Sequence, residues 1–156
     1  MLAAGTRGSV ATNFMKEASQ DFLGTVRDRA HPQCIACGRE NRSGLGVDFY
    51  LRSDKGVEAI FNCDPKHQGY TGYLHGGIAS LLMDSAMANC LFAHKIKAVT
   101  ARLIVRYHLP VKTGTPVIVR AWMREYEPPL YVLEAELEQE NSVAVHASAK
   151  FINQDV

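Results

Sequence analysis

The residues best suited to chemistry lie in one stretch, which runs from Tyr73 to Ala93 and contains a His-Gly-Gly sequence followed by a single carboxylate. After Gly77 the stretch is rich in Ala, Leu and Met and contains neither Gly nor Pro, which predicts a helix. Its apolar residues leave no polar face, so we expect the helix to be buried almost all round. Asp84 is the one ordinary charged residue inside it. Because a buried carboxylate is costly and its pKa is liable to be raised, Asp84 is the first catalytic candidate. A structural Asp that caps a loop or lies at the helix edge is the alternative.

A second pattern of chemical interest is Cys34-x-x-Cys37, which follows His31. A zinc site needs four ligands, usually two such pairs or a Cys/His quartet. Only His31, Cys63 and His67 offer further ligands here, and none belongs to a recognisable second pair. A redox dithiol is expected at a strand-to-helix turn, but a polar turn follows Cys37. We therefore favour a structural knuckle and predict no metal and no cofactor, with metal binding and redox chemistry as the alternatives.

The composition indicates one globular domain. A chain of 156 residues can bury most of its apolar surface without disulfides or metals. A net charge of +1 gives no electrostatic reason to expect nucleic acid or an anionic membrane as a partner. No apolar run approaches the length of a membrane span, and the N-terminus lacks a secretory apolar core. Four cysteines do not make a disulfide framework, so we expect a cytoplasmic protein.

The elements that must position these residues follow from hydrophobic periodicity. Helical spacing predicts an N-terminal helix from Val10 to Arg29, capped by Ser9 or Thr12, which either covers a sheet edge or partner subunit or is a loosely held appendage. A loop at 63–74, rich in Gly and aromatic residues, leads into the apolar helix and is well placed to line a pocket. The strand-like runs are 46–52 and 57–62, which form a hairpin, then 98–108, 117–124, 130–139 and 143–152.

Consecutive strands of this kind argue for an antiparallel sheet. The predicted fold class is α+β, with five to six strands wrapped around one long hydrophobic helix, plus an N-terminal helix. We place an N-terminal extension at residues 1–40 and the main domain at 41–156. The apolar helix and the sheet edges both need cover, so we expect a homodimer, with a dimer of dimers as an open alternative.

The His75-Gly76-Gly77 sequence, with Asp84 nine positions after the His, resembles the hotdog-fold thioesterases and, within them, the PaaI-like branch. The similarity continues through residues 98–114 and the last strand, and covers roughly residues 45–153. The Cys-x-x-Cys segment resembles an uncharacterised subset of these proteins.

This resemblance implies hydrolysis of an acyl-CoA thioester. In the family, the acid at the Asp84 position attacks the thioester or activates water, and the N–H at the Gly76 position polarises the carbonyl. About 12 Å of helix separates the two residues, at 1.5 Å per residue. The implied arrangement therefore pairs Gly76 of one subunit with Asp84 of its partner across the dimer interface.

The resemblance also implies roles for neighbouring residues. His75 supports the turn or contacts the substrate. Thr100 helps to hold the attacking water or is an ordinary strand residue. Relatives often carry an amide six residues before the His, where this chain has Gly69, so a shift of the loop would be needed for Gln68 to serve instead. The predicted substrate-binding residues are Gly77, Gln68, Gly69 and Tyr73.

Other interpretations stay open. A non-catalytic acyl-CoA-binding protein would use the same tunnel. A hydratase is the weaker alternative, because it would need a His soon after Asp84 and the next one is His94. Arg102, Arg106 and Lys112 are candidates for the CoA phosphates, although a solvated strand face explains them as well.

Overall fold

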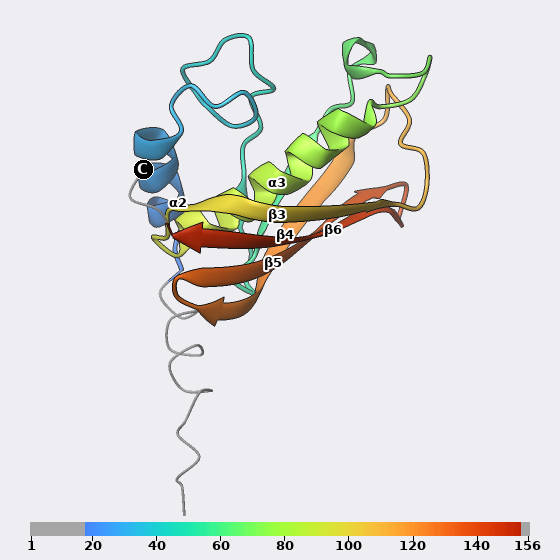
Figure 1. The fold of residues 1–156 in the computed structure, drawn as a ribbon. Coiled ribbons are helices and arrows are strands. Elements are labelled where there is room, and N and C mark those ends of the chain that lie inside the picture. Colours follow the sequence, from blue (N-terminus) through green and yellow to red (C-terminus); the bar gives the residue numbers. More distant parts are fainter. Residues whose placement is uncertain (1–17, 154–156) are drawn as a thin grey trace, which may run out of the picture.

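The computed structural model describes residues 18–153, which form a six-stranded antiparallel sheet curled around one long helix (Figure 1). The elements in chain order are α2 (Gln20–Ala30), β1 (Tyr50–Leu51), β2 (Val57–Phe61), the 3-10 turn η2 (Pro65–His67), α3 (Gly76–Ala93), β3 (Ala98–Tyr107), β4 (Val117–Glu127), β5 (Leu130–Gln139) and β6 (Ser142–Asn153). The predicted fold class is confirmed, including the hydrophobic central helix and a helix that precedes the sheet.

The strands lie in the order β1-β2-β4-β5-β6-β3, and each neighbouring pair is antiparallel. Buried and half-buried residues alternate along β5 for its whole length. This alternation arises because successive side chains of a strand point to opposite faces of the sheet. The inward residues of β5, among them Leu133 and Leu137, belong to one hydrophobic core together with α3.

Helix α3 is buried unevenly. Every residue from Ser85 to Ala93 is buried, as predicted. In the first half, however, Gly77 is exposed, and Ser80, Leu81 and Asp84 are only half-buried. These four positions follow the i, i+3, i+4, i+7 spacing of one helix face, so the expected burial all round is wrong for the first half of α3 in a single chain. We call these four residues the open stripe of α3.

The length of the apolar run in α3 also differs from the prediction. Its 18 residues are long and apolar enough to cross a membrane by length and composition alone, although we expected no such run. In the folded chain 67% of this window is buried, which is the behaviour of a core helix. The sheet supplies the apolar surroundings that the sequence requires.

Strand β3 forms one edge of the sheet, where it pairs with β6 alone. The register shifts between Thr100 and Arg102, so that Ala101 is an extra residue on β3. Such a β-bulge inserts one extra residue into the strand. The residues on one side of the bulge therefore point to the opposite face of the sheet from the one that regular alternation would give them. Thr100 is exposed but consequently lies on the α3 side of the sheet, opposite buried Phe151, whereas Arg102 faces the other side, opposite exposed Lys150.

The N-terminal segment packs on the same core as the sheet. Helix α2 begins after Ser19, whose side chain accepts a hydrogen bond from the Phe22 N–H and so caps the helix. Leu23 is fully buried in the common core. The predicted helix from Val10 is therefore observed only from Gln20, since its first residues and its two proposed caps lie outside the described residues. The domain boundary at residue 40 stays a prediction.

Two strands differ from the predicted ones by three residues or more at one end. The first strand covers only Tyr50–Leu51, because Val47 instead donates its backbone N–H to the carbonyl of Ala36 at 2.9 Å. The segment before β1 thus pairs with the cysteine loop rather than with β2. Strand β4 continues to Glu127, three residues beyond the predicted end, because its last residues pair with the start of β5 after a register shift.

Candidate active site

Asp84 is held in place by a residue from the edge strand. Its Oδ1 atom accepts a hydrogen bond of 2.7 Å from the Thr100 hydroxyl. Burial raises the pKa of the Asp84 carboxyl, although the Thr100 hydrogen bond and the nearby His31 lower it. Among the described residues no donor binds the second oxygen, Oδ2. The helix therefore presents a half-buried carboxylate with one oxygen fixed and the other available.

The start of α3 is organised by His75. Its Nδ1 atom accepts a hydrogen bond of 2.8 Å from the Gly77 N–H, which makes His75 the N-cap of the helix. Its carbonyl accepts from the N–H groups of Ile78 and Ala79. Within residues 18–153 the N–H of Gly76 has no acceptor. Because a helix N-terminus carries a partial positive charge, this free N–H is suited to an oxyanion.

The two glycines of the motif differ in the space around them. A Cβ atom on Gly77 would come within 3.0 Å of the His75 ring, so a side chain there would push the cap aside. A Cβ atom on Gly76 would meet only the ring of Tyr107, at the ordinary contact distance of 3.5 Å. In the single chain, therefore, a side chain at position 77 would crowd the cap, whereas position 76 has room for a Cβ atom.

Tyr107 and Ser80 also belong to this site, although neither was predicted from the sequence. The Tyr107 hydroxyl, at the end of β3, donates a hydrogen bond of 2.8 Å to the Gly76 carbonyl and also contacts the Ser80 hydroxyl. These contacts join β3 to the first turn of α3. No sequence signal links positions 76 and 107, because their contact depends on β3 lying alongside α3.

The predicted loop residues gather beside His75. The Gln68 side-chain carbonyl accepts from the Gly72 N–H at 3.1 Å, so its oxygen holds the loop closed. Gly69 lies against His75, and a Cβ there would be 3.4 Å from the Cα of that residue. Tyr73 is 42% exposed. The structure thus brings these residues together next to the start of α3, and their roles in substrate binding stay predictions.

Within one chain, Asp84 and Gly76 do not share a site. They lie eight residues apart on one uninterrupted helix, which corresponds to about 12 Å. Asp84 with Thr100 forms one group, and the Gly76 N–H with its His75 cap forms another. One small ligand group cannot contact both groups of the same chain, and we call these two groups the candidate half-sites.

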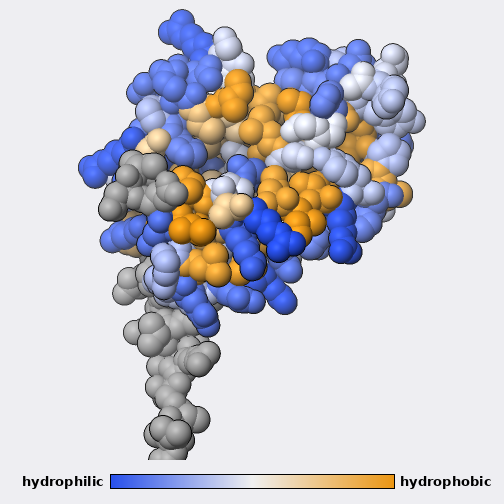
Figure 2. All heavy atoms as spheres, viewed as in Figure 1, coloured by the Kyte–Doolittle hydropathy of each residue, from blue (hydrophilic) through white to orange (hydrophobic). Residues whose placement is uncertain are grey.

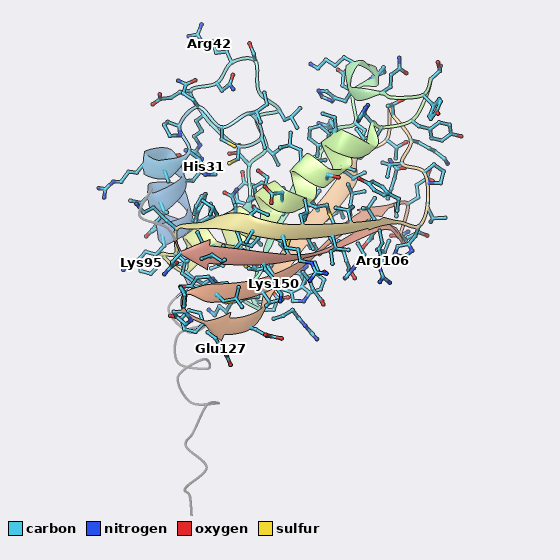
Figure 3. The ribbon with its side chains drawn as sticks, viewed as in Figure 1. His31, Arg42, Lys95, Arg106, Glu127 and Lys150 are labelled. Carbon is cyan, nitrogen blue, oxygen red and sulfur yellow. The ribbon has the colours of Figure 1, made fainter. Side chains whose placement is uncertain are left out.

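The basic residues fall into two sets. Arg106 and Lys150 lie on the side of the sheet away from α3 (Figure 3), and Arg102 faces outward with them. Lys112 forms an ion pair with Glu140 at 3.0 Å. A different basic set, missed in the sequence, surrounds a hollow of about 470 Å³ that adjoins the start of β3: Arg29, Lys95 and Lys97.

A comparison with protein-family models identifies the superfamily of the chain. The family model described as thioesterase superfamily matches residues 71–149, just over half of the chain, including α3 and most of the sheet. The chain belongs to the thioesterase superfamily.

Similar sequences support the same membership. This thioesterase-superfamily chain is 26% identical over 122 residues to the acyl-coenzyme A thioesterase THEM4 of Rattus norvegicus, covering 75% of this chain and 53% of that protein. The THEM4 protein of Mus musculus is 25% identical over the same length. The chain therefore spans about half the length of the curated relatives that it matches.

Solved structures confirm the fold. The PaaI protein of E. coli has a TM-score of 0.72 at 17% identity, covering 87% of this chain and 96% of that one. A protein of Streptococcus mutans, solved with acetyl-CoA bound, has a TM-score of 0.67 at 17% identity, covering 74% and 94%. Another thioesterase superfamily protein matches at 19% identity with a TM-score of 0.75, covering 97% of this chain and 82% of that one.

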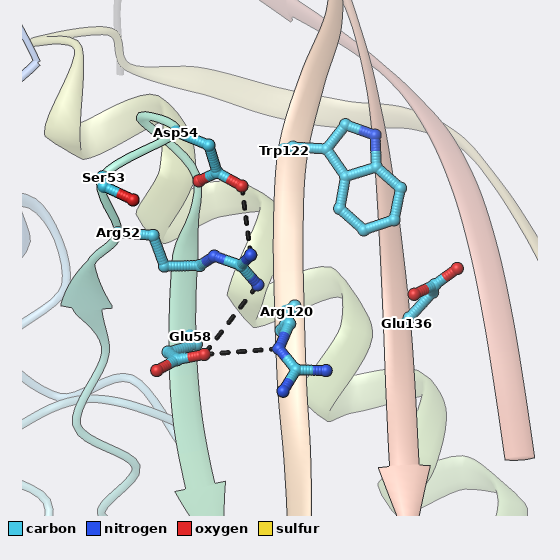
Figure 4. A pocket seen from close by; sticks show the side chains of 7 residues that line it. All are labelled: Arg52, Ser53, Asp54, Glu58, Arg120, Trp122 and Glu136. Carbon is cyan, nitrogen blue, oxygen red and sulfur yellow. Dashed lines mark hydrogen bonds and ion pairs between the residues drawn. The ribbon is translucent and has the colours of Figure 1, made fainter. Parts of the chain in front are cut away.

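A hollow on the outer sheet face of this thioesterase-superfamily protein has a different character (Figure 4). Four of its charged side chains form ion pairs with one another: Arg52 contacts Asp54 at 3.1 Å, and Arg120 contacts Glu58 at 3.3 Å. Arg120 also binds Glu138 at 2.6 Å. These groups form an ion-pair network between neighbouring strands, so we assign no chemistry to this hollow.

The cysteine loop forms the one cluster that could hold a metal among the described residues. One ligand atom from each of His31, Cys34 and Cys37 lies within 4.8 Å of the others. From the sequence, His67 was a further candidate ligand. Its ring instead packs against Phe61, with the two ring centroids 5.3 Å apart. Burial lowers the pKa of His31, although the Asp84 charge raises it.

Proposed function

We propose that the protein is an acyl-CoA thioesterase, which hydrolyses an acyl-CoA thioester to the free acid and coenzyme A. The observation that carries this proposal is the presence, on one helix, of a fixed Asp84 carboxylate and a free Gly76 N–H. Support comes from the superfamily membership, from relatives named acyl-coenzyme A thioesterases, and from a fold neighbour solved with acetyl-CoA.

The chemistry follows from the two half-sites. Asp84 either takes a proton from water, so that the hydroxide attacks the thioester carbon, or attacks that carbon itself. The carbonyl oxygen becomes an oxyanion, which the Gly76 N–H of the partner subunit stabilises. The carbon–sulfur bond then breaks, and coenzyme A leaves as a thiolate that is protonated by solvent. With water as the attacking group, this step yields the free acid. With Asp84 as the attacking group, the acyl group stays on Asp84 as a mixed anhydride, which a water molecule then hydrolyses to the free acid and the regenerated carboxylate. Thr100 fixes one carboxylate oxygen and so leaves the other for the reaction.

A homodimer completes the site in this proposal. The open stripe of α3 leaves Asp84 and Gly77 uncovered on the face that also carries edge strand β3. Figure 2 shows apolar side chains gathered on this face, and the exposed apolar residues at the end of β3 and just after it include Tyr107 and Leu109. Exposed apolar surface beside an unpaired strand edge is typical of an interface. A dimer of dimers is compatible with the same contact.

The basic hollow beside β3 supports the proposal that the ligand is an anion. Arg29, Lys95 and Lys97 would attract the phosphates of coenzyme A, and Val99, which also lines the hollow, is next to Thr100 in the chain. The four free cysteines are compatible with the cytoplasmic location that we propose. Both statements are part of the proposal and depend on the same acyl-CoA substrate.

The test is a hydrolysis assay over short, medium, long and aromatic acyl-CoA thioesters. Asp84→Asn is expected to lower turnover by at least about two orders of magnitude, because a positioned acid or base contributes 10²–10⁴-fold. Asp21→Asn, at an exposed position in the first turn of α2, is the matched control and should leave turnover unchanged.

Near-normal turnover by the Asp84→Asn protein would remove this residue from the mechanism. The alternative, a non-catalytic acyl-CoA-binding protein, predicts a different result. Thioesters would raise the unfolding temperature of the wild-type protein, but none of the panel would be hydrolysed.

A further inference from the structure

We propose that His31, Cys34 and Cys37 form a binding site for one Zn²⁺ ion, which fixes the cysteine loop (residues 31–38) to the middle of α3. The ligand atoms of the three residues all lie within 4.8 Å of one another. In a tetrahedral zinc site, Zn–S and Zn–N bonds of about 2.3 and 2.0 Å place the ligand atoms about 3.5–3.8 Å apart. Each separation between two ligand atoms would therefore need to shorten by at most about 1.3 Å to close this cluster around the ion.

The backbone of the loop prearranges the three ligands. His31 ends α2, with its N–H bonded to the Arg27 carbonyl at 2.7 Å (Figure 3). The Cys34 N–H donates to the His31 carbonyl at 3.2 Å, and the Gly38 N–H donates to the Cys34 carbonyl at 3.0 Å. These turns bring Cys34 and Cys37 to the same side of the loop as His31. The ligand spacing is thus fixed by main-chain hydrogen bonds rather than by the ion alone.

Gly38 shows how tightly the loop is wound. A Cβ atom at this position would come within 2.3 Å of the Cys34 backbone nitrogen and 2.6 Å of the Pro32 carbonyl oxygen. Both contacts are to backbone, so neither can be relieved by moving a side chain. Only glycine can therefore follow Cys37 in this conformation.

The surroundings of the cluster suit a bound cation and its thiolate ligands. Cys37 is 2% exposed, and its sulfur accepts a hydrogen bond of 3.4 Å from the Asn89 side-chain amide of α3. Hydrogen-bond donors to ligand sulfurs are a common outer layer of metal sites. The Nδ1 atom of His31 is buried and has no hydrogen-bond partner among residues 18–153. A buried ring nitrogen without a partner is uncommon, and a metal ion gives it one.

The donor set selects the class of ion. Two thiolates and one imidazole favour zinc and other soft or borderline cations over Mg²⁺ and Ca²⁺, which prefer oxygen ligands. Three protein ligands leave a fourth position for water or another small ligand. Binding releases the two thiol protons to solvent. The ion would join the end of α2 to α3 at Asn89, little more than one turn after Asp84.

The test uses the full-length, reduced protein after removal of metal with a chelator. We expect Co²⁺, a spectroscopic substitute for Zn²⁺, to bind at one ion per chain with thiolate-to-cobalt charge-transfer absorption. Zn²⁺ should abolish this absorption by displacing Co²⁺, because zinc binds more tightly to such sites. Zn²⁺ should also raise the unfolding temperature of the wild-type protein, because it binds the folded chain.

Matched variants distinguish metal binding at this cluster from metal binding at other cysteine and histidine side chains. Cys37→Ser and His31→Gln should lose the cobalt absorption, whereas Cys63→Ser and His67→Gln should keep it, because Cys63 is equally buried but lies outside the cluster. Where a variant does not fold, the wild-type titration alone decides. The proposal is overturned if the reduced wild-type protein binds no Co²⁺, or if a Cys34→Ser/Cys37→Ser variant keeps the absorption. It is also overturned if the purified protein contains a Cys34–Cys37 disulfide and no metal.

Discussion

At the scale of single residues, the candidate site depends on two groups in unusual environments. Asp84 is a carboxylate in a mostly apolar helix, and one hydroxyl, that of Thr100, compensates part of its burial. His75 uses its ring as a helix cap, a role more often filled by Ser, Thr, Asp or Asn. Each group therefore has a structural effect that can be measured apart from catalysis.

The raised pKa of Asp84 predicts a pH-dependent effect on stability. Burial disfavours the ionised carboxyl, so the wild-type protein loses stability as pH rises through the raised pKa of the folded state. Asn does not titrate. We therefore expect Asp84→Asn to be more stable than wild type at neutral pH, with a difference that shrinks as pH falls to the ordinary range of Asp. Thermal unfolding of both proteins from pH 4 to 8 measures this difference in stability. A difference that grows as the pH falls would contradict a raised pKa for Asp84.

The cap role of His75 predicts a separable defect. His75→Ala leaves the Gly77 N–H without its acceptor, so it should cost about 1 kcal/mol in the free energy of unfolding. His75→Asn should recover most of this loss, because Asn is among the best N-cap residues. Chemical denaturation measures both. If the Asn variant is stable but its acyl-CoA hydrolysis is impaired, then His75 contacts the substrate as well as supporting the turn.

At the scale of elements, the site depends on how β3 lies against α3. The bulge at Ala101 turns Thr100 toward Asp84, and Tyr107, further along the same strand, reaches the first turn of the helix. One strand therefore contacts both half-sites of its own chain. The start of α3 contributes a backbone donor, which cannot be removed by an ordinary side-chain substitution.

Proline at position 76 removes this donor with little structural cost. Gly76 is the first residue of α3, where Pro is favoured, and it does not have a positive φ. His75 has φ −61° and ψ 130°, which a residue before proline readily adopts. We expect Gly76→Pro to fold normally but to lower turnover by about 10²–10³-fold, as removal of an oxyanion donor does. Gly76→Ala, which keeps the N–H, is the control. Equal turnover of the Pro and Ala variants would exclude the donor role.

At the scale of the whole molecule, the proposed function divides each active site between two candidate half-sites, which a single chain keeps apart on one helix. The open stripe of α3 and the free edge of β3 share one face, so a second copy in a two-fold arrangement would bring opposite half-sites together. In such a dimer, every active site uses residues of both chains. This arrangement can be distinguished from a site within one chain by mixing variants.

Complementation between two inactive variants tests the shared site. Asp84→Asn and Gly76→Pro homodimers should both be nearly inactive. In a mixed dimer, one site combines the intact Gly76 of one chain with the intact Asp84 of the other. Random exchange at equal concentrations should therefore restore about a quarter of wild-type activity, since half of the dimers carry one intact site of two. Activity that stays at the level of the separate variants after exchange would place the site within one chain.

The sequence by itself determined the central helix, the positions of the strand-like runs along the chain, and a motif that resembles the superfamily. These follow from local signals: an apolar stretch without Gly or Pro, period-2 alternation, and the spacing of His75 and Asp84. Hydrophobic periodicity is enough to locate these elements, because the apolar face of a helix or strand must be buried whatever it packs against. The sequence also selected Asp84, since a lone carboxylate in an apolar helix is visible without coordinates.

Only the tertiary structure decided which residues meet. A regular alternation would place Thr100 on the same face as Arg102, and only the bulge reverses it. The contact of Tyr107 with Gly76 and the gathering of His31 with Cys34 and Cys37 depend on how separate elements pack, because no local pattern encodes a distance between them. The exposure of the open stripe likewise emerged from packing, since the sheet covers only part of an otherwise apolar helix.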